Sequence, residues 1–235
     1  MTTESTTTND FIDIPSASWN VLYTCRRLTL DEVKRYAESA TGELLDVGCG
    51  RQPYRSLFQN LTRYQGVDTA SSVHDLPPDT VVFDGETLPF EDNSFDCAIA
   101  TEVFEHVKRP AALFAEIRRV LRPGGQLMLT VPFIQALHES PYDFRRPTPF
   151  WLQETLQAAG FDGIEIAALG SWHHSFAHFF GLYAWHCYKN NKFAYPLLAL
   201  ASIHRRLVWN RSRKSRFKPV DGQMCVGWSA TAKRS

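Results

Sequence analysis

Three aspartates each follow a short apolar run, where carboxylates could serve a ligand. Asp46 comes after Leu44 and Leu45, while Asp68 and Asp84 end runs of their own. If these runs are parallel strands, their carboxyl ends meet at one edge of a sheet, which is where ligands bind in such folds. An aspartate at a strand end is also a common turn cap. Three acids in equivalent positions favour a ligand site over three separate caps.

A turn with two glycines lies directly beside the first of these acids. In the stretch LLDVGCGRQPYRSLF, Gly48 and Gly50 allow backbone N–H groups to come close to a ligand. A dinucleotide turn would have a third glycine, but Pro53 stands in that place. Asp46 would also repel a phosphate and attract an ammonium group. The turn therefore favours a zwitterionic ligand, and an NAD-dependent dehydrogenase is the weakest interpretation.

Alternating helical and extended patterns predict a parallel sheet with crossover helices. Helices are expected over 29–40, where Thr29 and Glu32 form a capping box, and over 53–61, 110–121 and 148–159. Strands are expected over 43–47, 64–67, 81–83, 95–101, 126–132, 164–168 and 224–232. The fold class is α/β: a Rossmann-like, seven-stranded, mostly parallel sheet with helices on both faces. A long helical insertion separates the sixth and seventh strands.

Composition fits one enzyme-sized domain. The chain has 235 residues, 44% of them hydrophobic, and a formal net charge of zero, so nothing global indicates nucleic acid. Its five cysteines are scattered without a C-x-x-C pair, which is typical of reduced thiols in the cytoplasm. Residues 1–15 are polar and expected to be disordered. The domain is expected over 16–170 and 220–235, with the insertion over 171–219.

An ordered set of motifs resembles one known family. The segments LLDVGCG, GVD, FDGETLPFEDNSFD, TEVFEHV, RVLRPGGQLMLTVPF and AAGF follow one another as in class I S-adenosylmethionine-dependent methyltransferases of the type 11 and type 12 kind. The resemblance covers roughly residues 42–161. It implies methyl transfer with S-adenosyl-L-methionine as cofactor, in agreement with the zwitterion expected at the turn.

The resemblance also assigns cofactor-binding residues. It places Gly48, Cys49 and Gly50 around the amino-acid part of the cofactor, with Asp46 attracting the ammonium group directly or through water. It places Asp68 on the ribose hydroxyls. The adenine would meet Asp84, Gly85 and Glu86, and Thr101 completes the set. The sequence departs from many members at Gln52, where a third glycine is common, so the shape of the loop is an open question.

The acceptor site should lie after the strand at 126–132. There the stretch HESPYDFRRPT is similar to a loop in methyltransferases of polysaccharide and glycolipid gene clusters. His138 is the candidate general base, since imidazole titrates near neutral pH. Glu105 and His106 are further catalytic candidates. Tyr142, Asp143, Arg145 and Arg146 could contact the acceptor, although the arginines could equally pair with acids of their own loop.

The TEVFEHV segment allows a second interpretation. Glu102, Glu105 and His106 resemble the E-x-x-E-H set that binds a divalent metal in small-RNA 2′-O-methyltransferases and in some quinone O-methyltransferases. Spacing of three and four residues would put the three side chains on one face of a helical turn, with His138 as a fourth ligand. The same segment is widespread in members with no known metal. A divalent metal is therefore permitted by the sequence but not expected.

The insertion carries aromatic and basic residues at helical spacing. Trp172, Phe176, Phe179, Phe180, Tyr183 and Cys187 predict a helix face that most often packs on a sheet and less often meets a membrane. A second apolar helix is expected at 197–208. A basic run follows from Arg205 to Lys218, and it is typical of a solvated surface, an anionic membrane or a phosphate-bearing substrate. Nucleic acid is not expected.

The sequence predicts an O-methyltransferase for a sugar hydroxyl of a glycan or glycolipid, including lipid-linked ones. The basic insertion and the His138 loop both favour this acceptor. A small-molecule or quinone O-methyltransferase is the alternative within catalysis. A non-catalytic S-adenosylmethionine-binding module is the alternative outside it. The expected location is the cytoplasm, with peripheral membrane contact through 171–219 left open.

Overall fold

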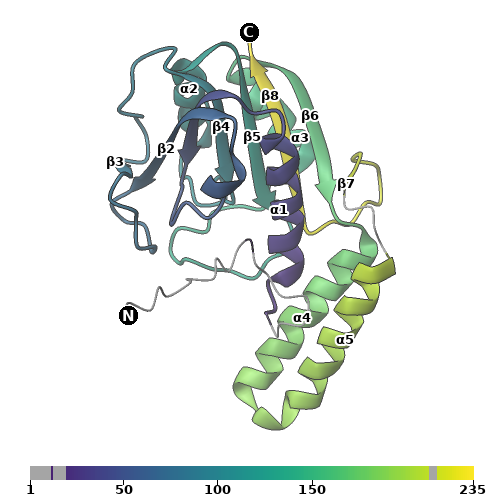
Figure 1. The fold of residues 1–235 in the computed structure, drawn as a ribbon. Coiled ribbons are helices and arrows are strands. Elements are labelled where there is room, and N and C mark those ends of the chain that lie inside the picture. The colour runs from purple at the N-terminus through teal and green to yellow at the C-terminus, as the bar shows by residue number, and fades with distance from the viewer. Residues whose placement is uncertain (1–11, 13–19, 212–215) are drawn as a thin grey trace.

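The computed structural model describes residue 12 and residues 20–211 and 216–235. The predicted disordered tail over 1–15 lies, apart from Ile12, outside the described residues. Within the described part the chain forms a sheet with helices on both faces (Figure 1).

The sheet has the order β3-β2-β1-β4-β5-β8-β6-β7. Strands β1 to β5 pair in parallel, while β8 runs antiparallel between β5 and β6. The seven predicted strands are all present, and a two-residue strand in the insertion, β7, adds an eighth at the edge. The strands are β1 (Gly42–Val47), β2 (Leu61–Thr69), β3 (Val81–Phe83), β4 (Phe95–Thr101), β5 (Leu121–Pro132), β6 (Phe161–Leu169), β7 (Arg216–Phe217) and β8 (Gly227–Arg234).

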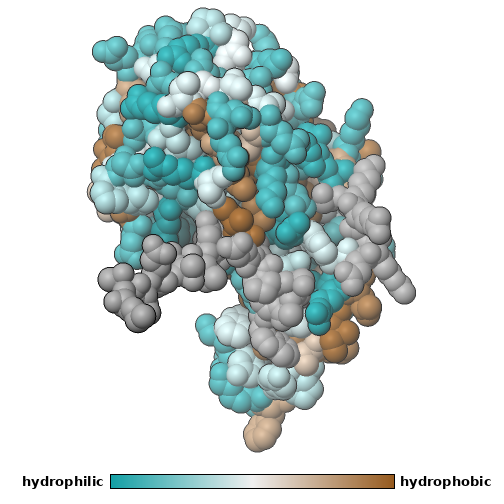
Figure 2. Space-filling model, in the orientation of Figure 1, coloured by the Kyte–Doolittle hydropathy of each residue, from teal (hydrophilic) through white to brown (hydrophobic). Residues whose placement is uncertain are grey.

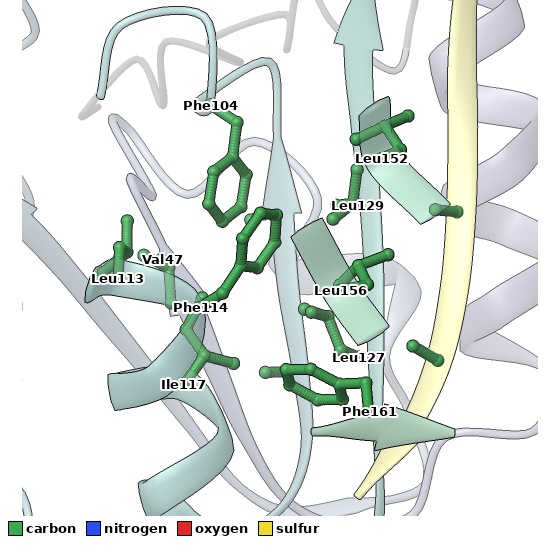
Figure 3. Close-up of a cluster of buried hydrophobic side chains, with 14 of the residues drawn as sticks. Val47, Phe104, Leu113, Phe114, Ile117, Leu127, Leu129, Leu152, Leu156 and Phe161 are labelled. Atoms are coloured by element: carbon green, nitrogen blue, oxygen red, sulfur yellow. The ribbon is translucent and has the colours of Figure 1, made fainter. Parts of the chain in front are cut away.

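Helices cover both faces of this sheet. On one face, α1 (Tyr23–Ala37) buries Leu30 and Val33 against β1 and β4. On the other face lie α2 (Pro110–Val120) and α3 (Pro149–Ala158), and their leucine, isoleucine and phenylalanine side chains form the larger core (Figure 3). The predicted class I architecture is thereby confirmed.

One buried aromatic pair fixes the loop that follows β4. The ring of Phe104 stacks on Phe114 of α2 with centroids 3.9 Å apart, and both rings are fully buried (Figure 3). Phe104 belongs to the TEVFEHV segment, so core packing anchors the middle of the loop that carries Glu102, Glu105 and His106. Burying two large rings contributes several kcal/mol to this anchoring.

Two predicted helix boundaries are wrong. Helix α1 starts at Tyr23, so Thr29 lies inside the helix and does not cap it. Glu32 instead accepts a hydrogen bond from Ser229 of β8, which ties the helix to the sheet. The helix expected over 53–61 is only a short 3-10 turn, η1 (Arg55–Leu57), because β2 begins at Leu61 to pair with β1.

The insertion forms a helical hairpin that projects beyond the sheet, below it in Figure 1. It consists of α4 (Trp172–Asn190), the 3-10 turn η2 (Lys192–Ala194) and α5 (Tyr195–Arg211). None of the helices in the described ranges is long and apolar enough to cross a membrane.

The prediction that the aromatic face of α4 packs on the sheet is wrong. Trp172, Phe176, Phe179 and Tyr183 are 54–59% exposed. The buried face carries mostly small or polar residues, including Ser175, Ala177, Gly181 and Ala184. Small side chains let α5 and the start of α1 approach closely, and this contact turns the aromatic residues away from the core.

Candidate active site

A cavity of about 740 Å³ opens at the carboxyl edge of the parallel strands. Its walls come from the ends of β1, β2 and β4, the loops after them, and the loop after β5. The predicted cofactor residues Gly48, Cys49, Gly50, Asp68, Asp84, Gly85, Glu86 and Thr101 all line it. The structure therefore brings one end of β1, β2 and β4 and the segment after β3 into a single site.

The glycine turn has the shape that the sequence indicates. Gly48 has φ +67°, and a Cβ there would lie 2.5 Å from a methyl group of Val103. The turn stays joined to the sheet because Gly48 N donates to Val67 O over 2.8 Å. Glycine is thus required both by backbone conformation and by the close approach of the neighbouring loop.

Gln52 stands where many members of the family have a third glycine, and it adopts a backbone conformation that favours glycine. Its φ is +54°, in the left-handed region, and its side chain is buried beside Gly66. The amide is held on both sides, since Gln52 Nε2 donates to Thr80 Oγ1 and Arg55 donates to Gln52 Oε1. These contacts offset the cost of a left-handed side chain, which is of order 1 kcal/mol.

Asp68 is placed to bind hydroxyl groups. One carboxylate oxygen accepts a hydrogen bond from Gly50 N at 2.8 Å and the other accepts from Thr69 N at 2.7 Å. A carboxylate has about four acceptor positions, so each oxygen can accept one more hydrogen bond from the cavity. Asp68 therefore joins the glycine turn to any ligand whose paired hydroxyls it binds.

Asp84 is both a turn cap and a wall of the cavity. Its carboxylate accepts from the backbone N–H groups of Glu86 and Thr87, and these bonds lower the pKa of Asp84. Glu86 in turn forms an ion pair with Arg109, which also lines the cavity. The sequence allowed Asp84 to be either a turn cap or part of a ligand site, and its position is compatible with both roles.

Asp46 lies behind the glycine turn and is not among the cavity-lining residues. Its side chain is buried, and the Tyr64 hydroxyl donates to it. Burial raises the pKa of Asp46 to about 7, although the Tyr64 hydrogen bond acts in the opposite direction. A direct contact with an ammonium group would need a shift of the turn, whereas a contact through water fits the present arrangement.

Two histidines face each other at the other end of the cavity. The rings of His106 and His138 are 4.8 Å apart and both line the cavity. His106 Nδ1 lies 3.1 Å from Tyr142 O, and His138 Nδ1 lies 3.1 Å from Ala136 O. A carbonyl oxygen only accepts hydrogen bonds, so Nδ1 carries the proton in each ring. The Nε2 atoms are therefore the basic ones in the neutral rings.

Both Nε2 atoms are directed toward a buried carboxylate. Glu105 Oε1 lies 3.7 Å from His106 Nε2 and 4.0 Å from His138 Nε2. Its side chain is fully buried, and neither oxygen has a hydrogen-bond partner in the described part of the chain. Burial and the neighbouring Glu102 carboxylate raise the pKa of Glu105 well above its usual range. A proton or a cation among these groups would remove the repulsion between their lone pairs.

The loop after β5 uses its charged residues to hold itself in place. Arg146 pairs with both oxygens of Asp143, which holds the pKa of this acid down at about 2. Arg145 donates to the backbone oxygens of Phe104, Val107 and Lys108. Of the predicted acceptor contacts only Tyr142 lines the cavity. The pairing alternative describes Arg146, whereas Arg145 binds backbone oxygens.

Asp143 also orients the candidate base. Its Oδ2 accepts a hydrogen bond from His138 N at 3.1 Å and lies 3.3 Å from His138 Nδ1. The proton held on Nδ1 leaves the lone pair on Nε2, the atom on the Glu105 side of the ring, as in other sites where a carboxylate sets the tautomer of a histidine.

Several cavity residues carry no clear signal in the sequence. Leu22, Cys25 and Arg26 come from the first turn of α1 and its approach, which lay outside the predicted helix. Gln135 follows β5 and contacts α4, since its side-chain oxygen lies 3.0 Å from His178 Nε2. Arg109, the residue before Pro110 at the start of α2, could have been identified as a partner for Glu86.

Comparison with known proteins identifies the central part of the chain. Residues 45–129 match the type 11 family model described as a methyltransferase domain. This part of the chain is a class I methyltransferase domain. The predicted resemblance is confirmed at the level of this family, and the methyltransferase fold accounts for the strand order and the ligand edge described above.

Relatives and a solved structure agree with this assignment. A Mycobacterium avium protein named an uncharacterized methyltransferase is 41% identical over 105 residues, which are 40% of this chain and 42% of the relative. The phthiotriol/phenolphthiotriol dimycocerosates methyltransferase 1 of Mycobacterium ulcerans is 33% identical over 117 residues, 43% of each chain. A SAM-dependent methyltransferase structure from Thermotoga maritima aligns with a TM-score of 0.57 at 14% identity, covering 92% and 91% of the two chains, and shows the shared fold.

The sequence matches are confined to one part of each relative. The chain spans about two fifths of the length of the curated relatives it matches. The shared part contains the glycine turn and the TEVFEHV segment, whereas the hairpin lies outside the matched residues 45–129.

The methyltransferase domain predicts a defined effect at Asp68. Replacing Asp68 with Asn removes the charge and one acceptor oxygen, so the affinity for S-adenosylhomocysteine should fall about 10- to 100-fold, as expected for lost charge-assisted hydrogen bonds. Titration calorimetry measures this, with Asp162→Asn on the exposed start of β6 as control. Undiminished binding would refute the ribose assignment. Tight NAD binding without S-adenosylhomocysteine binding would refute the cofactor.

Asp46 should lower the free energy of unfolding, and by more at high pH than at low pH. Its pKa is raised on folding, so the unfolded chain loses this proton at lower pH, and stability falls as pH rises from about 4 to about 7. Asp46→Asn should therefore increase the free energy of unfolding by about 1–3 kcal/mol at pH 8 and by less at pH 5. Urea unfolding at both pH values tests this. A gain that does not change with pH would contradict the assignment.

Proposed function

We propose that this protein transfers a methyl group from S-adenosylmethionine to a hydroxyl oxygen of a glycan or glycolipid. The observation that carries the proposal is His138, which lines the same cavity as the glycine turn and whose Nδ1 is fixed by Ala136 O and Asp143. A base held in this way supports a hydroxyl acceptor, because a hydroxyl must lose its proton as the new bond forms.

The residues present fit the cofactor. The cradle at Gly48 would be filled by any Cβ, and Asp68 keeps acceptor positions open toward the cavity. When bound, S-adenosylmethionine supplies an electrophilic methyl group on a sulfonium and becomes S-adenosylhomocysteine. Asp68 would hold the ribose hydroxyls, and the turn from Gly48 to Gly50 would hold the amino-acid part.

The chain then has two tasks at the acceptor. His138 Nε2 would accept the proton of the acceptor hydroxyl, which leaves the acceptor oxygen free to take the methyl group that the cofactor would supply. The imidazolium formed would be stabilised by Glu105 and Asp143, which lie 4.0 Å and 3.3 Å from its two nitrogens. Alignment of the acceptor oxygen with the methyl group in the cavity would supply the rest of the acceleration.

A lipid-linked acceptor has support from outside the site. The Mycobacterium ulcerans relative is named for a lipid acceptor, phthiotriol or phenolphthiotriol dimycocerosates. The His138 loop resembles loops of glycan and glycolipid methyltransferases, and the cavity includes the apolar Leu22, Ile134 and Val226 beside its polar residues. A sugar hydroxyl attached to an apolar group would fit a cavity wall that combines polar and apolar residues.

Removing the base should separate catalysis from cofactor binding. His138→Gln should lower kcat by about 100- to 10,000-fold while S-adenosylhomocysteine affinity stays unchanged. The assay follows labelled methyl transfer from S-adenosylmethionine to a glycolipid extract, with products tested for alkali-stable methyl ethers. His173→Gln, on the exposed side of α4, is the matched control. Full activity in His138→Gln would rule out the base.

A divalent metal is a second candidate for the same cluster, because buried Glu105 has both oxygens unpartnered. Glu105, His106 and His138 offer ligand atoms within 4.8 Å of one another, with Glu102 next to them. This donor set fits a metal that accepts oxygen and imidazole ligands. Bound there, a metal would supply Lewis-acid polarisation of the acceptor hydroxyl.

Chelation distinguishes the two roles of His138. With His138 as a base and no metal, activity should persist after treatment with EDTA. If activity needs added Mn²⁺ and fails equally in Glu102→Ala, Glu105→Ala and His106→Ala, then His138 is a ligand. A rise in Tm with Mn²⁺ that is lost in Glu105→Ala would support the metal independently of turnover.

A further inference from the structure

The hairpin of α4 and α5 presents a continuous apolar surface to solvent. Trp172, Phe176, Phe179 and Tyr183 are spaced by four, three and four residues, so they lie on one face of α4. On α5, Leu200, Ile203 and Leu207 are each about 55% exposed, and Phe193 in the connecting turn is 92% exposed. Figure 2 shows hydrophobic atoms along the side of the hairpin where α5 lies and at its tip.

The exposed stripes of the two helices are joined. The Phe176 ring packs against His204 of α5 with centroids 5.3 Å apart, and Phe180 contacts the same imidazole. His204 lies one helical turn from both Leu200 and Leu207, so all three share a side of α5. We define the hairpin surface as Trp172, Phe176, Phe179, Tyr183, Phe193, Leu200, Ile203 and Leu207.

The charge around this surface has one sign. No aspartate or glutamate occurs between Glu165 and Asp221. Lys189, Lys192 and Arg206 are exposed on the hairpin, and Lys218 is exposed beyond it. A surface that combines aromatic side chains with lysine and arginine, and lacks acids, complements an anionic lipid headgroup layer.

Part of the predicted basic run does not add exposed positive charge beside the hairpin surface. Arg205 is buried, donates to Asn20 O and lies over the Tyr23 ring, while Arg216 pairs with Glu32 of α1. Arg213 and Lys214 lie outside the described residues, and the side chain of Arg211 is not described either. Of the predicted run, Arg206 and Lys218 are exposed, and Lys189 and Lys192 add two exposed cations from outside it.

The charge pattern also decides against a second copy as the occupant. Two copies packed through the same surface would bring Lys189, Lys192 and Arg206 of both copies to one interface without an acid of the hairpin to pair with them. An anionic bilayer removes this repulsion and accepts the aromatic rings at its interface.

We infer that the hairpin surface docks the protein on an anionic membrane, lying in the headgroup region without crossing the bilayer. The root of the hairpin is close to the acceptor end of the cavity. Leu169 lines the cavity three residues before α4 begins, and His178 of α4 contacts Gln135 of the cavity wall. Docking does not depend on methyl transfer, whereas delivery of a lipid-linked acceptor rests on the proposed function.

Vesicle cosedimentation tests the docking. In low salt, wild type should bind vesicles of phosphatidylcholine that contain about 30 mol % phosphatidylglycerol, a fraction that gives a strongly anionic surface. It should bind pure phosphatidylcholine at least about tenfold more weakly, and high salt should release it. Protein that stays in the supernatant with anionic vesicles in low salt would overturn the inference.

Matched variants separate the aromatic and electrostatic contributions. Phe176→Ser with Phe179→Ser should weaken vesicle binding about tenfold or more, whereas Phe150→Ser, at an even more exposed position on α3, should not. Lys189→Gln, Lys192→Gln and Arg206→Gln together should weaken it about 100-fold, at about fivefold for each charge. All variants should keep wild-type S-adenosylhomocysteine affinity, which shows that the domain is folded.

The remaining outcomes are equally decisive. Unchanged vesicle binding in the aromatic pair would overturn the role of the hairpin surface. A wild-type dimer in analytical ultracentrifugation that becomes monomeric in the same pair would show that the surface joins two copies, and would overturn membrane docking. If the aromatic pair variant loses vesicle binding but still methylates a water-soluble glycoside at the wild-type rate, the result would support docking and leave the proposed function standing.

Discussion

The register of β1 against its two neighbours is the constraint on which the site depends. Asp46 is paired with Gly66 of β2 and with Ile99 of β4, so β1 is fixed from both sides. Because of this pairing, the chain beyond Val47 leaves the sheet beside the end of β2, where Gly50 N reaches Asp68. A slip of one residue would turn every side chain of β1 to the opposite face and separate the turn from its acid.

The same edge of the sheet holds buried acids that destabilise the fold and, close to them, aromatic packing that stabilises it. Asp46, Glu102 and Glu105 are acids in surroundings that raise their pKa values, and none of them stabilises the folded state through its charge. Within the loop that carries Glu102 and Glu105, the ring of Phe104 stacks on Phe114 of α2. Stability supplied by that packing allows an electrostatically unfavourable cluster to persist at the cavity, a pattern typical of functional sites.

The sequence predicted the sheet well because buried parallel strands are read from local apolar runs. It failed where longer-range contacts decide. The start of α1 was missed because Tyr23 and Leu28 gain their burial from α4, α5 and β6, which are distant in the chain. On α4, periodicity identified two faces, one aromatic and one rich in small residues, but could not say which one is buried. In the loop after β5, the sequence singled out His138, and this residue does line the cavity. The partners of Arg145 are backbone oxygens, which no sequence pattern shows.

Strand β8 follows all the other strands in the chain, yet it lies between β5 and β6. While the protein is being synthesised, β5 and β6 must therefore wait as two open edges, each with a row of unpaired N–H and C=O groups. The hairpin with its exposed aromatic rings emerges during the same interval, because it precedes β8 in the chain. Until β8 pairs with both strands, these open edges and exposed rings are sites at which the nascent chain can misassemble.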